Sequence, residues 1–184
     1  MEEKNKAWKT VSSKYLFRRP WLTVRCEDML LPNGNHIPEY YILEYPDWVN
    51  TIAVTSDGQF VFIRQYRHGL QQTSYELCAG VCEKEDASPL ASAQRELLEE
   101  TGYGNGSWQE YMQISPNPST HTNITYCFLA TGVEKISEQH LEDTESLSVH
   151  LLTLAEVKEL LQKGEIKQAL MAAPLWKYIA EKGL

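Results

Sequence analysis

The sequence predicts an α+β fold, an α/β/α sandwich around a mixed sheet, with a small antiparallel β element in front of it. Three observations carry this prediction. Strand-like runs separated by a turn fill residues 9–45, a capped helical segment lies at 89–101, and two more helical segments follow the last strand. With 184 residues and 42% hydrophobic content, the chain can bury the core of one compact domain plus a short extra element.

The N-terminal part is expected to be a β element of its own. Asn33 and Gly34 stand between two alternating segments, which is a strong hairpin signal. We therefore divide the chain into residues 1–46, the N-terminal β element, and residues 47–184, the larger domain. Residues 50–56 and 59–67 are rich in β-branched and aromatic side chains and are expected to be paired central strands of that domain.

The segment at 89–101 has the end signals of a helix. Ser88 and Pro89 form an N-cap and first turn, and Gly102 stands where a left-handed C-terminal residue is common. On this helix three carboxylates share one side, those of Glu96, Glu99 and Glu100. Such crowding destabilises a helix, but hard oxygens are the ligands that Mg²⁺ or Mn²⁺ requires. A solvated acidic face is the alternative that helical spacing alone allows.

The rest of the chain completes the sheet and adds two helices. Strands are predicted at 110–114 and 122–131, with a Pro-rich loop between them, and another strand after the acidic stretch 142–145. Thr153 and Glu156 form a capping box for a helix that ends at Gly164. The last helix ends at Gly183, and Pro174 is expected either to kink it or to lie near its start.

Composition excludes several classes of function. A net charge of −8 without a basic run argues against a nucleic-acid partner, and no apolar run is long enough to span a membrane. The four cysteines lack zinc-like pairing and are expected to be reduced, mostly buried thiols. These features predict a soluble, cytoplasmic protein without nucleic-acid or membrane partners.

The segment from Gly80 to Tyr103 closely resembles the signature of the Nudix hydrolases. The match is complete in its second half, where Arg95 precedes Glu96, and Glu99 and Glu100 precede the glycine. The first half departs from the pattern, because Asp86 stands where the family has glutamate and one residue is inserted before the helix. The resemblance implies a Nudix-type sandwich fold.

The resemblance also implies the parts of a metal site for two or three Mg²⁺ ions, with Mn²⁺ as an alternative. Glu96 and Glu100 would be shared ligands, Glu99 would join or orient them, and the Ala79 carbonyl would be a further ligand. Arg95 would hold the glutamates by salt bridges. An acidic loop before the last strand supplies another carboxylate in this family, as ligand or base, and here Glu145 is favoured over Asp143.

Residues outside the signature resemble the branch that hydrolyses ADP-ribose and related nucleotide sugars. The segments around Gln65 to Arg67 and Tyr75 to Gly80 match its strands next to the active site, with Cys78 where proline is common. By this resemblance Arg67 would bind the diphosphate or terminal ribose, and Pro118 would lie in the substrate loop. Trp21 and Tyr40 resemble base-stacking aromatics that a partner subunit contributes, although both could simply pack the hairpin.

The resemblance therefore implies a Mg²⁺-dependent homodimer in which the N-terminal β element is exchanged between the subunits, and which hydrolyses the pyrophosphate bond of a nucleoside diphosphate sugar. ADP-ribose is the expected substrate, with AMP and ribose 5-phosphate as products. A GDP-mannose or other sugar-nucleotide pyrophosphatase is the alternative on the same scaffold. A non-catalytic module that senses ADP-ribose is the alternative of another class, and retention of all three helical glutamates weighs against it.

Overall fold

The computed structural model describes residues 6–183, which form two units. An N-terminal unit ends at Tyr45 and also includes Asn117–Asn123, and a core unit takes Pro46–Pro116 together with the chain from Ile124 onward. The sequence-based division placed the 117–123 segment with the larger domain. Its place in the N-terminal unit depends on backbone pairing with the edge of a strand, which no local sequence pattern indicates.

The N-terminal unit is a three-stranded antiparallel sheet in the order β1, β2, β3, with bounds Lys9–Arg19, Leu22–Leu30 and His36–Glu44. The predicted hairpin between β2 and β3 is confirmed. Gly34 takes a φ of 86°, and the side chain of Asn33 accepts a hydrogen bond from the Asn35 amide at 3.0 Å. At the end of β3, the Leu43 amide donates to the Thr120 carbonyl at 2.8 Å, so the 117–123 segment extends this sheet.

The core unit contains a mixed sheet with the central order β11, β5, β4, β10, β8. Its strands are β4 Trp48–Thr55, β5 Phe60–Arg67, β6 Gln72–Glu76, β7 Cys78–Val81, β8 Tyr103–Gly104, β9 Ser107–Ile114, β10 Thr125–Lys135 and β11 Leu147–Leu152. The pairing of β4 with β10 is parallel, whereas β5 and β7 pair with β4 in antiparallel register. The predicted α+β class with a mixed sheet is confirmed.

Strand β10 differs from its predicted bounds of 122–131 at both ends. It begins at Thr125 and continues to Lys135, past Gly132. Gly132 has a φ of 71°, and the register with β4 shifts between Thr131 and Val133. The glycine therefore forms a β-bulge and does not end the strand.

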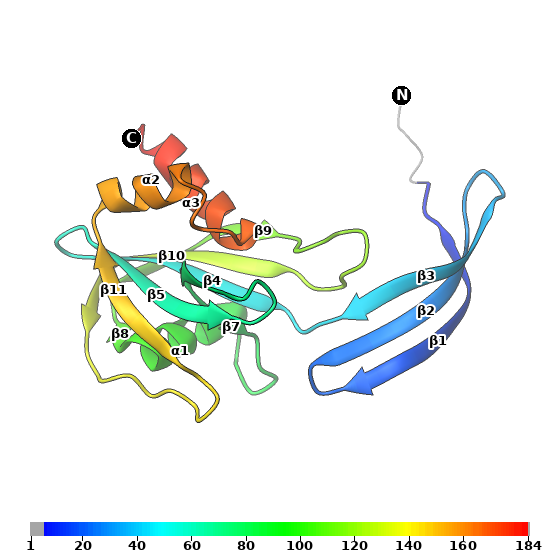
Figure 1. Cartoon of the computed structure of the whole chain (residues 1–184), viewed down its shortest axis with the longest axis horizontal. Helices are drawn as coiled ribbons and strands as arrows, with labels where there is room; N and C mark the ends of the chain where they lie inside the picture. The colour runs from blue at the N-terminus through cyan, green and yellow to red at the C-terminus, as the bar shows by residue number, and fades with distance from the viewer. Residues whose placement is uncertain (1–5, 184) are drawn as a thin grey trace. The chain divides into compact units, whose positions relative to one another are not determined.

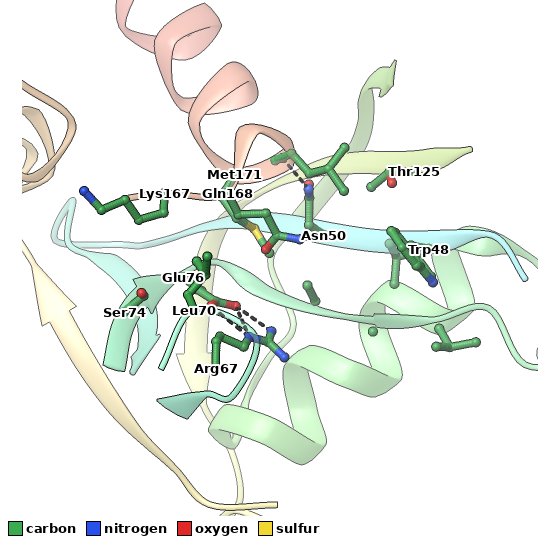
Figure 2. A pocket seen from close by; sticks show the side chains of 15 residues that line it. Trp48, Asn50, Arg67, Leu70, Ser74, Glu76, Thr125, Lys167, Gln168 and Met171 are labelled. Atoms are coloured by element: carbon green, nitrogen blue, oxygen red, sulfur yellow. Dashed lines mark hydrogen bonds and ion pairs between the residues drawn. The ribbon is translucent and has the colours of Figure 1, made fainter. Parts of the chain in front are cut away.

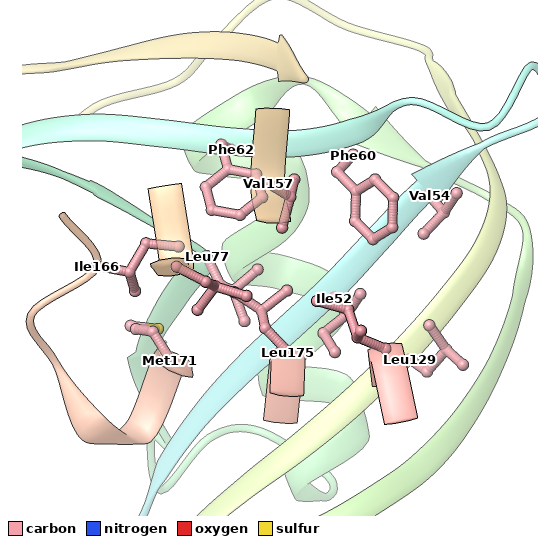
Figure 3. Packing of buried hydrophobic residues seen from close by; sticks show 12 residues of the cluster. Ile52, Val54, Phe60, Phe62, Leu77, Leu129, Val157, Ile166, Met171 and Leu175 are labelled. Carbon is pink, nitrogen blue, oxygen red and sulfur yellow. The ribbon is translucent and has the colours of Figure 1, made fainter. Parts of the chain in front are cut away.

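Helices cover both faces of the core sheet (Figure 1). The predicted helix at 89–101 is confirmed as α1, Pro89–Thr101, and the two C-terminal helices are α2, Leu154–Gln162, and α3, Ala169–Glu181. On the α2 and α3 side, Phe62 and Ile52 of the sheet pack with side chains such as Val157 and Leu175 (Figure 3). On the α1 side, Leu97 packs in a separate cluster. The arrangement is the predicted α/β/α sandwich.

Pro174 lies inside α3, because this helix begins at Ala169. A proline has no amide proton, so the carbonyl four residues earlier, that of Leu170, lacks its helical donor. The side chain of Asn50 in β4 supplies one, with Nδ2 donating to the Leu170 oxygen at 2.8 Å. Asn50 is only 1% exposed, and this bond connects the sheet to the first turns of α3.

Other local predictions can be compared directly with the structure. The Thr153 capping box of α2 is present, and Gly164 and Gly183 take positive φ angles of 66° and 65° after α2 and α3. All four cysteines are free, two of them buried and two half-buried. Within residues 6–183, none of the helices is both long and apolar enough to cross a membrane.

Candidate active site

Helix α1 presents the acidic residues, and its ends are fixed as the sequence predicts. The Ser88 hydroxyl accepts a hydrogen bond from the Ala91 amide at 3.2 Å. At the other end Gly102 is left-handed, with φ 75°, and its amide donates to the Leu98 carbonyl. These caps define the register of the helix and therefore the face on which its glutamates stand.

Arg95 connects the carboxylates around this helix. Its Nη1 donates to Glu96 at 3.1 Å and to Glu99 at 3.0 Å, while Nη2 donates to the Val81 carbonyl at 3.1 Å. A planar guanidinium can satisfy several acceptors at fixed angles, which a single ammonium cannot do. Arg95 thus contacts two of the three helical glutamates, and its role in a metal site stays a prediction.

Asp86 also binds Arg95, despite the inserted residue before the helix. It accepts from Nε at 3.2 Å and from Nη2 at 3.0 Å. The Arg95 guanidinium holds the pKa of the Asp86 carboxyl well below its usual range, at about 2. Asp86 therefore anchors the arginine from the loop between β7 and α1, a contact that the sequence pattern left open.

Glu96 lies directly against Gly80 of β7. A Cβ placed on Gly80 would stand 2.0 Å from the Glu96 carboxyl carbon. No residue with a side chain fits there unless Glu96 moves. Burial raises the pKa of Glu96, although the neighbouring Arg95 acts in the opposite direction.

Glu100 is the most buried of the three glutamates, with 5% of its surface exposed. It accepts a hydrogen bond from the Ala79 amide at 3.2 Å. Burial raises its pKa to about 7, and the charges of Glu96 and Glu145 contribute to this shift. The site therefore concentrates negative charge in a place that water screens poorly.

The acidic loop after β10 is attached to the C-terminal end of α1. The His140 amide donates to the Glu99 carbonyl at 2.9 Å, and the Gln139 side chain donates to the Glu100 carbonyl at 2.7 Å. These bonds satisfy helix carbonyls that have no partner in the helix itself. Sequence reasoning missed Gln139, because a single glutamine in a loop gives no signal.

The same loop carries the two candidates for the additional carboxylate. Glu145 accepts a hydrogen bond from the Glu142 amide at 3.0 Å and is close enough to contribute to the pKa of Glu100. Asp143 and Glu145 are both exposed. The charge of Glu145 reaches Glu100, while the choice between the two residues as base or ligand stays a prediction.

The residues present fit a divalent cation by their chemistry. Among residues 6–183, no three His, Cys, Asp or Glu side chains are already arranged so that they could hold a metal ion as they stand. Two features of the site nevertheless suit a divalent cation. Carboxylate oxygens are hard ligands, and a positive ion between the carboxylates would offset both the burial and the neighbouring charges that raise the pKa of Glu100. The open backbone at Gly80 leaves room for the Glu96 carboxylate beside β7.

A pocket of about 500 Å³ adjoins this site (Figure 2). Arg67 and Glu76 form part of its wall and make a bidentate ion pair, Nε to Oε1 at 2.9 Å and Nη2 to Oε2 at 2.6 Å. Glu76 is 3% exposed, and its hydrogen bonds raise the pKa of Arg67 further. The arginine that sequence reasoning assigned to the substrate therefore stands in a cavity, held in one orientation by a buried carboxylate.

The other predicted substrate residues belong to the N-terminal unit. Trp21 is 86% exposed in the turn between β1 and β2. The Tyr40 hydroxyl donates to the Ser119 carbonyl, and its ring meets Trp8 edge-on at 5.5 Å between centroids. Pro118 lies beside Ser119 in the 117–123 segment. The contribution of these three residues to substrate binding stays a prediction.

The fold and the arginine-linked glutamate helix define a hydrolase of the Nudix type, and comparison with known families agrees. A model of the NUDIX domain matches residues 45–173, and a model of the nucleoside diphosphate sugar hydrolase N-terminal domain matches residues 8–43. The chain belongs to the Nudix family and is a Nudix hydrolase. Enzymes of this family generally use divalent metal ions.

Individual relatives are similar over most of the chain. An ADP-ribose pyrophosphatase of Bacillus subtilis (strain 168) is 30% identical over 162 residues, which cover 88% of this chain and 86% of the relative. A methanol dehydrogenase activator of Bacillus methanolicus is 29% identical over 159 residues, covering 86% and 85%. A crystal structure of an ADP compounds hydrolase has a TM-score of 0.82 at 21% identity and covers 96% of each chain, which shows the shared fold.

Proposed function

We propose that this protein is a Mg²⁺-dependent hydrolase of the pyrophosphate bond of nucleoside diphosphate sugars, with ADP-ribose as its main substrate and AMP and ribose 5-phosphate as products. The observation that carries the proposal is the buried carboxylate of Glu100, which lies against the Ala79 amide with the charges of Glu96 and Glu145 near it. The 30% identical ADP-ribose pyrophosphatase supports the choice of substrate.

Hydrolysis of a pyrophosphate needs an activated water molecule, neutralised phosphate charge and in-line geometry. Two or three bound Mg²⁺ ions would supply Lewis acidity and a nucleophile of lowered pKa. Glu96 and Glu100 would hold them, together with the Ala79 carbonyl and Glu99. Arg95 keeps Glu96 and Glu99 in place, and Asp86 fixes the arginine from the other side.

The remaining roles concern the proton and the substrate. Glu145 would complete the ligand set or accept the proton of the attacking water, with Asp143 as the alternative. Arg67 would bind the diphosphate, because its guanidinium lines the pocket and its ion pair with Glu76 uses Nε and Nη2 but not Nη1. Pro118 would lie in the substrate loop, and Trp21 and Tyr40 would be the aromatic side chains that the partner subunit contributes to the nucleotide.

A homodimer is part of the proposal. The three-stranded N-terminal sheet exposes large apolar side chains, among them Trp8, Val11, Tyr15, Phe17 and Trp21. Single exposed apolar residues are common, but several on one short sheet indicate a surface that another chain covers. Sedimentation at micromolar concentration should give the mass of two chains, and a stable monomer would refute this part. The four free cysteines support a reducing, cytoplasmic location.

A turnover panel tests the choice of substrate. ADP-ribose, ADP-glucose, GDP-mannose, NADH, diadenosine polyphosphates and nucleoside triphosphates would be compared at equal concentration with Mg²⁺ present. The proposal expects the highest kcat/KM for ADP-ribose. A higher value for GDP-mannose would select the alternative enzyme, and binding of ADP-ribose without turnover of any compound would support a sensing module instead.

A further inference from the structure

Two buried polar atoms in the pocket have no partner. Asn50 of β4 and Thr125 of β10 both line it, and each is only 1% exposed. Asn50 Oδ1 and Thr125 Oγ1 make no hydrogen bond to any residue in the part of the chain that the structure describes. Buried polar atoms are nearly always paired, and a polar atom left unpaired in a cavity wall indicates a bound group that pairs with it.

The orientation of Asn50 is fixed by the rest of its own amide. Nδ2 donates to the Leu170 carbonyl, whose helical donor is missing because Pro174 stands four residues later. Rotating the amide by half a turn would place Asn50 Oδ1 against the Leu170 oxygen, which is also an acceptor. Nδ2 therefore faces Leu170, and Oδ1 lies on the other side of the amide. Asn50 therefore offers a positioned acceptor, and the Thr125 hydroxyl offers a donor or an acceptor (Figure 2).

The chemistry of the wall favours a neutral ligand group that carries hydroxyls. An anion would face the Asn50 oxygen, which only accepts hydrogen bonds, and would be repelled there, whereas Arg67 and Lys167 elsewhere in the wall suit the diphosphate. A purely apolar group would leave both polar atoms unpaired. A polyol both donates and accepts, so adjacent hydroxyls can pair with an amide oxygen and a threonine hydroxyl together. The pocket volume, about 500 Å³, lies in the range of small-molecule sites.

The position of the pocket connects it to the glutamates. Ala79 and Gly80 line it, and the same two residues contact the carboxylates. The Ala79 amide donates to Glu100, and Gly80, which has no side chain, lies against the Glu96 carboxylate. Arg67, the proposed diphosphate ligand, lines it as well. A group in this pocket is therefore adjacent to a pyrophosphate held at the glutamates.

We propose that Asn50 and Thr125 bind hydroxyl groups of the terminal sugar of the substrate and so determine specificity for a glycosylated diphosphate. This inference rests on the proposed function, since it assigns the sugar portion of that substrate to the pocket. It concerns recognition alone. The pair is expected to contribute to KM and not to the reaction step.

The test uses Thr125→Val, which removes the hydroxyl and keeps the shape, with Thr131→Val as the matched control. Thr131 is exposed on the same strand, outside the pocket. Loss of one hydrogen bond predicts a rise in KM for ADP-ribose of about 3- to 10-fold for Thr125→Val. The Ki of ADP, which lacks the terminal sugar, should not change, and kcat should not change. Thr125→Ser, which retains the hydroxyl, should keep the wild-type KM.

Two results would overturn the inference. Equal effects of Thr125→Val on ADP-ribose and ADP would place the pocket at the nucleotide, and no effect on either would mean that water alone pairs with the two atoms. Calorimetric titration without a divalent cation measures the affinities for ADP-ribose and for ADP, and so compares the two effects of Thr125→Val independently of turnover. If the wild-type protein hydrolyses no sugar nucleotide but the variant still loses affinity for ADP-ribose alone, the proposed function fails while the sugar site stands.

Discussion

The carboxylate of Glu96 occupies the space in which a side chain at position 80 would stand, 2.0 Å from the position of a Cβ on Gly80. The glycine of the Nudix signature is therefore required here for close approach and not for an unusual backbone angle, because its φ is not positive. The strand that precedes the helix and the helix that bears the glutamates are in contact at this point.

Gly80→Ala is expected to move the Glu96 carboxylate and to lower kcat by about 10- to 100-fold, the usual range for disturbance of a metal site. The destabilisation should be modest, about 1–3 kcal/mol, because the end of a flexible side chain can move aside. Steady-state kinetics and thermal unfolding measure both effects. Gly69→Ala is the control, since a Cβ there meets nothing within 4 Å. Unchanged kcat in Gly80→Ala would mean that the Glu96 position is not required.

Arg95→Lys should reduce activation by Mg²⁺ more than it reduces the stability of the fold. A lysine cannot contact Asp86, Glu96 and Glu99 together, so the glutamates lose their fixed positions. The Mg²⁺ concentration for half-maximal rate should rise by about 10- to 100-fold. Arg64→Lys, at an exposed position on β5, provides the comparison. If both variants required the same Mg²⁺ concentration, Arg95 would have no part in positioning the site.

The raised pKa of Glu100 predicts how the metal-free protein responds to pH. Its folded pKa, about 7, lies above the ordinary value of 4.5, so the protonated carboxyl is the form that the fold favours. This contribution to stability is fully present below pH 4.5 and is lost as the pH rises through 7. The free energy of unfolding should fall by up to about 3 kcal/mol across that interval.

Urea unfolding in the presence of a chelator, at pH 5, 6, 7 and 8, measures this change. Glu100→Gln has no titrating group at this position, and its difference from wild type isolates the contribution of Glu100 from that of the histidines. Added Mg²⁺ should stabilise the wild-type protein more at pH 8 than at pH 5, because a cation favours the ionised carboxylates. Parallel pH profiles for wild type and variant would show that the Glu100 pKa is not raised.

Gln139→Ala should loosen the acidic loop from the end of α1. The variant loses the bond to the Glu100 carbonyl, a cost of about 1 kcal/mol, and the His140 amide should exchange with solvent faster, since it donates to Glu99 in the same interface. The rate of substrate hydrolysis should fall several-fold if the position of Glu145 depends on this attachment. Glu138→Ala alters the exposed neighbour and serves as control. Equal exchange of the His140 amide in both variants would contradict this account of the loop.

Much of the fold was predictable because its signals are local. Ser88 and Gly102 specify the ends of α1, Asn33 and Gly34 specify a hairpin, and each is confirmed by a cap contact or a positive φ. Gly132 misled the strand prediction, because a glycine in a sequence does not reveal whether it ends a strand or bulges within it.

The site was predictable only in part. The signature located the glutamates, but the contacts that position them connect distant segments. Asp86 reaches Arg95 across an inserted residue, and Gln139 reaches the Glu100 carbonyl from 39 positions away. The Asn50 contact to α3 depends on Pro174, more than 100 positions later in the chain, and no spacing rule joins these two residues. Such pairs are defined by tertiary packing and are visible only in the structure.

The central claim is that the Glu100 carboxylate holds metal for pyrophosphate hydrolysis, and the most direct test is Mg²⁺-dependent release of AMP and ribose 5-phosphate from ADP-ribose by wild type and Glu100→Gln. The account predicts both products from the wild-type protein and a loss of about 100-fold or more in kcat for the variant, with ADP-ribose still bound. Full activity in Glu100→Gln would contradict the metal assignment.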